Sequence, residues 1–127
     1  MLNDLQPYAT LATADMAKAR SFYEETLGLT VLNDSPFGVT YKCGDGRVFL
    51  YESAFAGTNK ATAVSFEASV ESFDDEIEAL RQKGITFMTF DMEGMEWDNG
   101  VAIAGPTKSV WFSDPDGNIL NVSAGEM

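Results

Sequence analysis

Two segments of the chain alternate hydrophobic and polar residues as a half-buried strand does, and a helical pattern follows each of them. The alternation predicts strands at residues 8–13 and 63–68. Apolar side chains then recur every three or four positions over residues 16–26 and 73–83, which is typical of a helix with one buried face. The chain therefore starts two units in the same order, a strand and then a helix.

Polar residues and glycines mark the ends of both predicted helices. Asp15 and Ser72 stand just before the helical runs, and we expect their side chains to accept hydrogen bonds from the first free backbone N–H groups. Gly28 and Gly84 stand just after the runs, where glycine readily adopts the left-handed conformation that ends a helix. The two helices are thus bounded alike.

The segments that follow the helices differ from each other. In the first unit, residues 29–32 predict a strand that breaks at residues 33–36. In the second, residues 85–90 predict a strand, and residues 91–100 are expected to form an irregular acidic loop that carries Trp97. The carboxylates of this loop lack the ligand spacing of a calcium-binding loop, so we expect no calcium site there.

A hairpin pattern occurs twice in the chain. Residues 110–122 read as two hydrophobic strands joined by the turn Asp114-Pro115-Asp116-Gly117-Asn118, in which proline and glycine favour a tight reversal. Residues 39–51 align with this segment without a gap, which places Asp45-Gly46 on Asp116-Gly117. A repeated order of strand, helix and three strands indicates a duplicated fold.

The repeat predicts the fold class α+β, with two tandem βαβββ modules that form curved mixed sheets around a concave cleft and with the helices outside. Each half of the 127 residues is too small to bury its own sheet face, so the halves should associate. We expect a single domain of residues 1–127, with module one at about residues 5–53, a linker at about 54–60 and module two at about 61–125.

Composition narrows the range of partners. The formal net charge is −12, which repels phosphate backbones and anionic lipids, so we expect no nucleic acid and no membrane partner, whereas a cationic ligand would be attracted. The chain has no apolar run near the roughly 20 residues of a membrane span and no signal-peptide pattern at its start, which predicts a cytoplasmic protein. The single cysteine, Cys43, is expected to be a plain structural thiol, with a reactive thiol as the alternative.

The sequence contains no histidine. Histidine is the commonest transition-metal ligand and the usual acid–base group near neutral pH. Its absence excludes His-based zinc or iron sites, Ser-His-Asp triads and Cys-His dyads.

Together, the duplicated order, the first helix and the second turn resemble the vicinal oxygen chelate superfamily, which includes glyoxalase I, bleomycin-resistance proteins, fosfomycin-resistance enzymes and extradiol dioxygenases. The resemblance rests on Asp15, Phe22-Tyr23 and Leu27-Gly28, and on the turn Asp114-Pro115-Asp116-Gly117-Asn118. It implies a cleft in which His, Gln or Glu side chains from the first and last strands of each module hold a metal ion.

The ligand positions that the resemblance implies hold Tyr8, Leu50, Ser65 and Asn121 in this chain. Tyrosine and serine bind metals weakly unless deprotonated, leucine does not bind them, and one asparagine carbonyl supplies too little charge. We therefore expect the fold and the cleft of the superfamily without its metal, and no cofactor.

Strand alternation predicts which side chains line the cleft. Tyr8 and Trp111 would form aromatic walls, Glu67 would supply a carboxylate, and Trp97 is placed to close over the pocket. This composition suits a flat organic molecule that carries a cationic group. The expected ligand-binding residues are Tyr8, Thr10, Ser65, Glu67, Trp97, Trp111 and Asn121, and the same alternation directs Ala12, Val48, Leu50, Ser69 and Ile119 inward.

Several functions fit these expectations. The first is a non-catalytic homodimer of the bleomycin-resistance type that binds a small aromatic or cationic molecule. The second is a lyase or isomerase that uses Glu67, with Tyr8, as its acid–base group. A metal-dependent enzyme of the glyoxalase or dioxygenase type follows if the ligand positions are assigned wrongly, and a regulatory protein that acts through its dimer surface is a further alternative.

Overall fold

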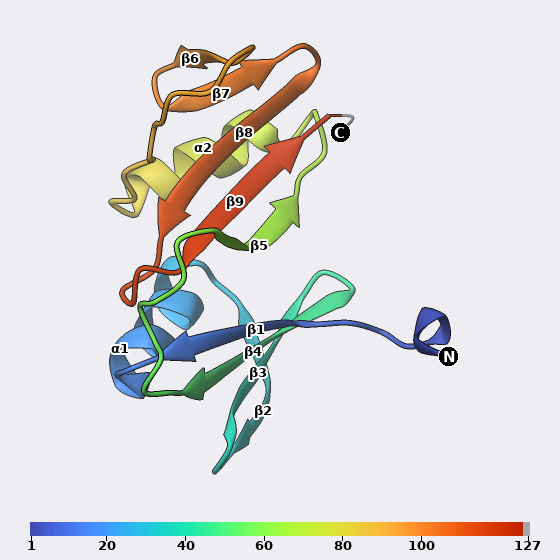
Figure 1. The fold of residues 1–127 in the computed structure, drawn as a ribbon, viewed down its shortest axis with the longest axis vertical. Helices are drawn as coiled ribbons and strands as arrows, with labels where there is room; N and C mark the ends of the chain where they lie inside the picture. Colours follow the sequence, from blue (N-terminus) through green and yellow to red (C-terminus); the bar gives the residue numbers. More distant parts are fainter. Residues whose placement is uncertain (126–127) are drawn as a thin grey trace.

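The computed structural model describes residues 1–125, which form two units of similar order (Figure 1). A short 3-10 turn, η1 (Leu2–Asp4), precedes the first unit. The first unit consists of β1 (Ala9–Thr13), α1 (Met16–Arg20), its π-helical continuation η2 (Ser21–Thr26), β2 (Thr30–Ser35), β3 (Gly38–Cys43) and β4 (Gly46–Glu52). The second unit consists of β5 (Thr62–Glu67), α2 (Phe73–Gln82), β6 (Glu96–Asp98), β7 (Val101–Ala104), β8 (Thr107–Ser113) and β9 (Ile119–Ala124).

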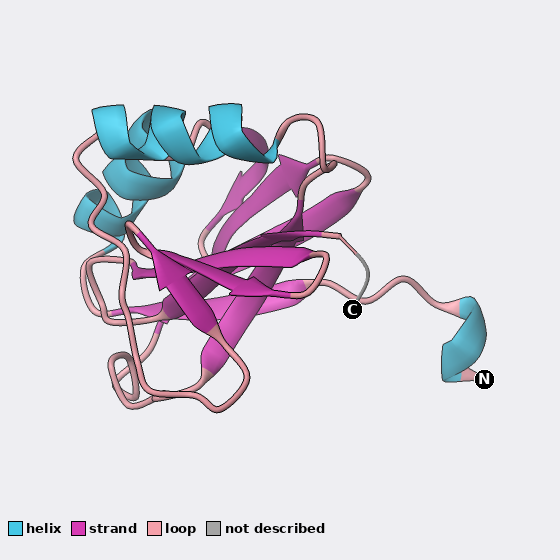
Figure 2. Cartoon of the chain, turned by 90° about the horizontal axis from the view of Figure 1, so that it is seen from above, coloured by secondary structure: helices cyan, strands magenta, loops and turns pink. Residues whose placement is uncertain are grey.

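Each unit contributes one mixed sheet. The strand orders are β1-β4-β3-β2 and β5-β9-β8-β7-β6, and in both sheets the first strand pairs in parallel with the last strand of its unit. The two sheets meet where β1 lies beside β5. Both helices lie on one side of the sheets (Figure 2). The predicted α+β fold of two tandem modules is confirmed.

One hydrophobic core lies between the helices and the two sheets. It joins buried side chains of both units, among them Tyr23, Leu50, Phe73, Phe112 and Leu120. We call the sheet surface toward this core the helix face, and the opposite surface the open face. Among the described residues, no helix is long and apolar enough to cross a membrane.

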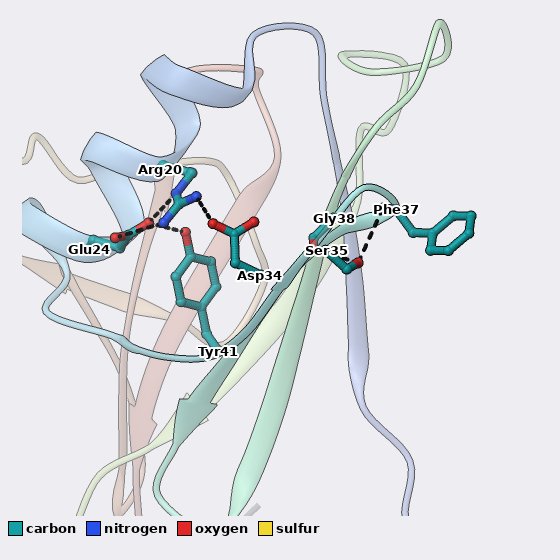
Figure 3. A network of polar contacts seen from close by, with 7 residues as sticks. All are labelled: Arg20, Glu24, Asp34, Ser35, Phe37, Gly38 and Tyr41. Carbon is teal, nitrogen blue, oxygen red and sulfur yellow. Dashed lines mark hydrogen bonds and ion pairs between the residues drawn. The ribbon is translucent and has the colours of Figure 1, made fainter.

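The first helix begins as the sequence predicts. The Asp15 carboxylate accepts a hydrogen bond from the backbone N–H of Lys18, and Gly28, with a φ of 75°, follows the last turn. On its outer side the Arg20 guanidinium donates to the carboxylates of Glu24 (2.7 Å) and Asp34 (2.6 Å). The Tyr41 hydroxyl also donates to Glu24, so this network ties the helix to β2 and β3 (Figure 3).

The second strand is longer than predicted. Residues 33–36 were expected to break it, but β2 continues through Asn33 and Asp34 to Ser35. A bulge at Leu32 absorbs the change of register, since Val31 pairs with Tyr41 and Asn33 with Thr40. The reversal comes at Phe37, which points away from the strands at the tip of the hairpin (Figure 3).

The second helix is capped by a different serine from the one predicted. Ser72 has helical backbone angles and its side chain caps nothing, so the prediction for Ser72 is wrong. Ser69 takes that role, because its Oγ accepts from the N–H of Ser72 and its carbonyl accepts from the N–H of Phe73. The cap lies three residues earlier because a helical turn precedes Phe73.

Residues 85–100 depart most from the prediction. Residues 85–90 form no strand, and their tie to the sheet is a hydrogen bond from the Met88 N–H to the Trp111 carbonyl. The expected irregular loop contains β6, which pairs with β7 through a turn at Asn99 (φ 49°) and Gly100 (φ 83°). Asparagine and glycine with positive φ are typical of a two-residue hairpin turn. Trp97 therefore lies on a strand.

The gapless alignment of the two hairpins fails at their turns. The turn between β3 and β4 has two residues, whereas five residues join Ser113 to Ile119 between β8 and β9. The buried pair Val48 and Leu50 of β4 therefore corresponds to Leu120 and Val122 of β9, one position further along than the alignment predicts. A slip of one residue moves a side chain to the other face of a strand. Val48 and Leu50 thus lie in the core, and their inward assignment is wrong.

The longer turn of the second unit fastens the two units together. The Asp114 carboxylate accepts a hydrogen bond of 2.6 Å from the Tyr23 hydroxyl, and both side chains are buried. The Asn118 amide donates to the Ala12 carbonyl, and the Ala14 N–H donates to the Asp116 carboxylate. Burial and the nearby Asp114 raise the pKa of Tyr23 well above its usual range, so the phenol remains a donor. We call this set of contacts the inter-unit lock.

Candidate functional site

The strand register brings most of the predicted ligand-binding residues of the second unit onto its open face. Asn121 of β9 pairs with Ser65 of β5 on one side and with Trp111 of β8 on the other, so the three side chains share a face. Glu67 pairs with Ser123 on the same face. Phe66, which lies between Ser65 and Glu67, points to the other face and packs against the core.

Three aromatic rings gather at one end of this face. The rings of Trp97 and Trp111 are 6.2 Å apart, and Phe90 lies 5.3 Å from the first and 5.0 Å from the second, in edge-to-face contact with both. These edge-on contacts are favoured by the charge distribution of aromatic rings. Phe90, Trp97 and Trp111, which we call the aromatic cluster, hold one another in place on three separate segments.

A pocket of about 400 Å³ adjoins the aromatic cluster. Its lining is Thr89, Phe90, Asp91 and Trp97. Sequence reasoning placed Trp97 here but missed Phe90 and Asp91, because it assigned them to a strand and a solvated loop. The Asn99-Gly100 turn was the available signal, since a hairpin there brings Trp97 back toward residues 89–91.

Asn121 is the polar centre of the open face of the second unit. Its side chain is only 5% exposed, and its amide donates to the Val110 carbonyl while its carbonyl accepts from the Ser123 hydroxyl. Both ends of the amide are therefore engaged by the protein. This arrangement fixes the orientation of Asn121 and lets it position the hydroxyl of Ser123, which pairs with Glu67.

The first unit contributes a second aromatic group. Tyr8 precedes β1, is 59% exposed and meets Phe49 edge-on at 6.5 Å, while Phe49 stacks on Tyr51 at 6.0 Å. Thr10 is exposed on the same face of β1. Phe49 and Tyr51 take the inward positions that the sequence assigned to Val48 and Leu50, as the one-residue offset requires.

Glu67 is exposed at the end of β5. It lies two residues from Ser65 on the same strand, whereas Tyr8 belongs to the other unit. No hydrogen bond or ion pair joins Glu67 to Tyr8 among the described residues. The described structure therefore shows no direct contact between the two groups that an acid–base mechanism would use.

The open face does not offer the donors of a metal centre. Tyr8 is exposed, Ser65 carries a neutral hydroxyl, and the Asn121 amide is already occupied by protein partners. Leu50 lies in the core, and Phe49 and Tyr51 stand in its place on the open face. Within residues 1–125, no three His, Cys, Asp or Glu side chains lie close enough together to hold a metal ion. These residues do not fit a divalent cation.

Comparison with known proteins places these features in a family. The family model of the Glyoxalase/Bleomycin resistance protein/Dioxygenase superfamily matches residues 5–122. A glutathione transferase, FosA, from Serratia marcescens is 30% identical over 132 aligned positions, which cover 100% of this chain and 84% of that protein.

Solved structures show the same fold. The fosfomycin resistance protein FosX from Listeria monocytogenes superposes with a TM-score of 0.72 at 14% identity, covering 98% of this chain and 95% of the other. A lactoylglutathione lyase from Agrobacterium tumefaciens gives a TM-score of 0.67 at 22% identity, with 96% and 94% covered. Since the family model spans most of the sequence, the chain belongs to the glyoxalase, bleomycin resistance protein and dioxygenase superfamily.

Proposed function

We propose that the protein binds a small, flat organic cation at the aromatic cluster, without chemical conversion, in the manner of a bleomycin-resistance protein. The observation that carries the proposal is the cluster itself, in which Phe90 and Trp97 line a pocket that also contains Asp91, and Trp111 packs against both rings. Aromatic faces attract cations and stack on flat rings, and a carboxylate adds charge complementarity. The net charge of −12 favours the same kind of ligand.

The known relatives support a small-molecule ligand. The relative from Serratia marcescens is described as a glutathione transferase, and FosX as a fosfomycin resistance protein. These functions concern small molecules. The Ser65 hydroxyl, on the same face of the second unit as Trp111, would help to orient such a ligand.

The enzymatic alternatives have less support from the geometry. A lyase or isomerase that relies on Glu67 and Tyr8 would need the two groups at one reacting centre, but they lie on different units. A metal-dependent enzyme would need donors that the open face does not hold. We therefore place binding ahead of catalysis.

We also propose that the protein is a homodimer. The N-terminal segment extends away from the body of the protein in both views, with Leu2 and Leu5 exposed (Figures 1 and 2). An extended segment with solvent-exposed leucines favours contact with a second copy of the chain, because that contact would bury the apolar side chains.

The binding proposal is tested with N-methylquinolinium and its neutral isostere 1-methylnaphthalene. We expect the cation to raise the melting temperature more than the isostere does, because only the cation gains the charge interaction with the rings and Asp91. Trp111→Leu should abolish the shift. Phe37→Leu, which changes an exposed ring outside the site, should leave it intact.

Two outcomes would contradict the proposal. One is an equal shift by both compounds that survives Trp111→Leu. The other is a large rise in melting temperature on addition of Zn²⁺, Mn²⁺ or Fe²⁺ that a chelator reverses, which would favour the metal-dependent enzyme.

A further inference from the structure

A second pocket, of about 310 Å³, lies between the two units on the helix side of the sheets. Leu27, Leu29 and Cys43 of the first unit border it on one side, and residues 66–69 and α2 of the second unit border it on the other. The pocket lies at the C-terminal end of β5, just after Phe66. The inter-unit lock lies at the other end, where the start of β9 pairs with the start of β5. The pocket and the lock therefore lie at opposite ends of the junction between β1 and β5.

The pocket results from the unequal turns of the two units. At the lock, the five-residue turn 114–118 reaches across to β1, and Tyr23 of the first helix fills the space beside it. At the pocket, the corresponding turn consists of Gly44 and Asp45 alone, and the second helix presents Leu80 and Glu76. The shorter turn leaves open the volume that its counterpart fills.

The lining combines an apolar floor with an acidic edge. The Glu76 carboxylate stands with Ser69 and Ser72 at the polar side, Glu67 borders the pocket at the end of β5, and in the described part of the chain neither lysine nor arginine lines the pocket. Apolar walls recognise a hydrocarbon or aromatic body, and carboxylates recognise a positive group. The floor is made by Leu27, Leu29, Phe66, Leu80, Phe112 and Val122.

We propose that this inter-unit pocket is a second ligand site, which takes an organic ammonium compound with an apolar body. The body lies against Phe66, Phe112 and Leu80, and the ammonium group lies toward Glu76. The site shares neither tryptophan nor Asp91 with the aromatic cluster. The proposal of this second site therefore does not depend on the function proposed above.

Cys43 provides a reporter for this pocket. It is the only cysteine of the chain, it is half-buried and it lines the pocket. Burial raises the pKa of its thiol, so alkylation is slow and is followed conveniently near pH 8.5. A ligand in the pocket covers the sulfur and slows the reaction further.

The test measures the rate at which iodoacetamide alkylates Cys43, by intact mass, in the presence of three compounds that share one ring system. Tryptamine is cationic, tryptophol is neutral and indole-3-acetate is anionic. We expect tryptamine to slow alkylation at the lowest concentration, tryptophol to act only at higher concentration, and indole-3-acetate to act least, because the lining carries negative charge alone.

Matched variants separate the pocket from general charge effects and from the aromatic cluster. Glu76→Gln should raise the tryptamine concentration that gives half protection by about threefold, whereas Glu78→Gln, an exposed change on the same helix outside the lining, should leave it unchanged. Trp111→Leu should also leave protection unchanged. Equal protection by the three compounds, no protection by tryptamine, or loss of protection in Trp111→Leu would overturn the proposal.

Discussion

Asp114 makes more contacts with the rest of the chain than its place in a surface turn suggests. One oxygen of its carboxylate accepts from the N–H groups of Asp116 and Asn118, and the other accepts from the Asn118 amide and from the Tyr23 hydroxyl. Asp114 is only 5% exposed, so water cannot easily replace its carboxylate. If the carboxylate were removed, four donors would lose their partner. A buried donor without a partner costs more than the bond itself contributes.

We expect Asp114→Ala to lower the free energy of unfolding by about 2–4 kcal/mol, and Tyr23→Phe by about 1–2 kcal/mol. The double variant should lose less than the sum, because both changes remove the same hydrogen bond. Urea denaturation of the three variants measures this coupling. Asp116→Ala, which removes a half-buried acceptor that binds the exposed Ala14 N–H, is the control and should cost less than about 1 kcal/mol. Strict additivity would show that the Tyr23–Asp114 bond contributes nothing.

Glu24 should make stability depend on pH. The hydrogen bond from Arg20, aided by that from Tyr41, lowers the pKa of the Glu24 carboxyl in the folded protein. A lowered folded pKa favours the charged form, so its contribution is complete above the unfolded value of about 4.3 and is lost as the pH falls through the folded value. The free energy of unfolding of the wild type should exceed that of Glu24→Gln by about 0.5–1 kcal/mol at pH 7, and this difference should disappear below about pH 4. Urea titrations from pH 3 to pH 8 measure it, and an unchanged difference at pH 3 would refute this account.

At the scale of elements, the sequence predicted what local patterns determine. The first helix, its Asp15 cap, its end at Gly28 and the strand after it follow from spacing and glycine chemistry. The pattern did not reveal that five residues join β8 to β9 whereas two join β3 to β4, since Asp-Gly occurs at both turns. Because of this one difference, Leu50 was predicted to line the cleft although it lies in the core. Among the predicted site residues, Trp111 of β8 and Asn121 of β9 lie opposite each other on the open face.

The β6–β7 hairpin depends on one backbone position. Gly100 has a φ of 83°, and an added Cβ would lie 3.3 Å from the Cβ of Phe87. Gly100→Ala should destabilise the protein by about 1–2 kcal/mol and separate Trp97 from Trp111. Circular dichroism of the coupled indoles measures the separation. Asn99→Gly, at a φ of 49°, relieves strain and should preserve the signal. An unaltered signal in Gly100→Ala would show that the turn does not hold Trp97.

At the scale of the whole molecule, duplication supplied two sheets but left them unequal. The core runs through both units, so neither sheet buries its apolar face alone. The polar contacts between them concentrate in the inter-unit lock, where one turn supplies Asp114, Asp116 and Asn118. The shared core and the inter-unit lock together explain how the two units stay associated although a pocket lies between them.

The exposed N-terminal leucines allow the proposed dimer to be tested. Leu2→Asp and Leu5→Asp together should shift the protein from dimer to monomer in light scattering at micromolar concentration, because each would place a charge in an apolar contact. The melting temperature at high dilution should not change. Leu32→Asp alters another exposed leucine, at the bulge of β2, and should leave the dimer intact. A wild-type protein that is already monomeric would refute the proposed dimer.

The one-sided attachment of the units also limits how the molecule can move. Separation at the lock would break the buried Tyr23–Asp114 and the partly buried Asn118–Ala12 hydrogen bonds. Separation at the other end of the junction parts apolar side chains such as Leu27 and Leu80 and breaks one exposed 3.5 Å hydrogen bond from Lys83 Nζ to the Glu25 carbonyl. The softest motion is therefore a rotation of one unit against the other about a hinge at the turn 114–118. With such a hinge, the inter-unit pocket opens and closes as the units rotate. The rate of this opening, rather than the volume of the closed pocket, would then set how fast a bulky molecule enters.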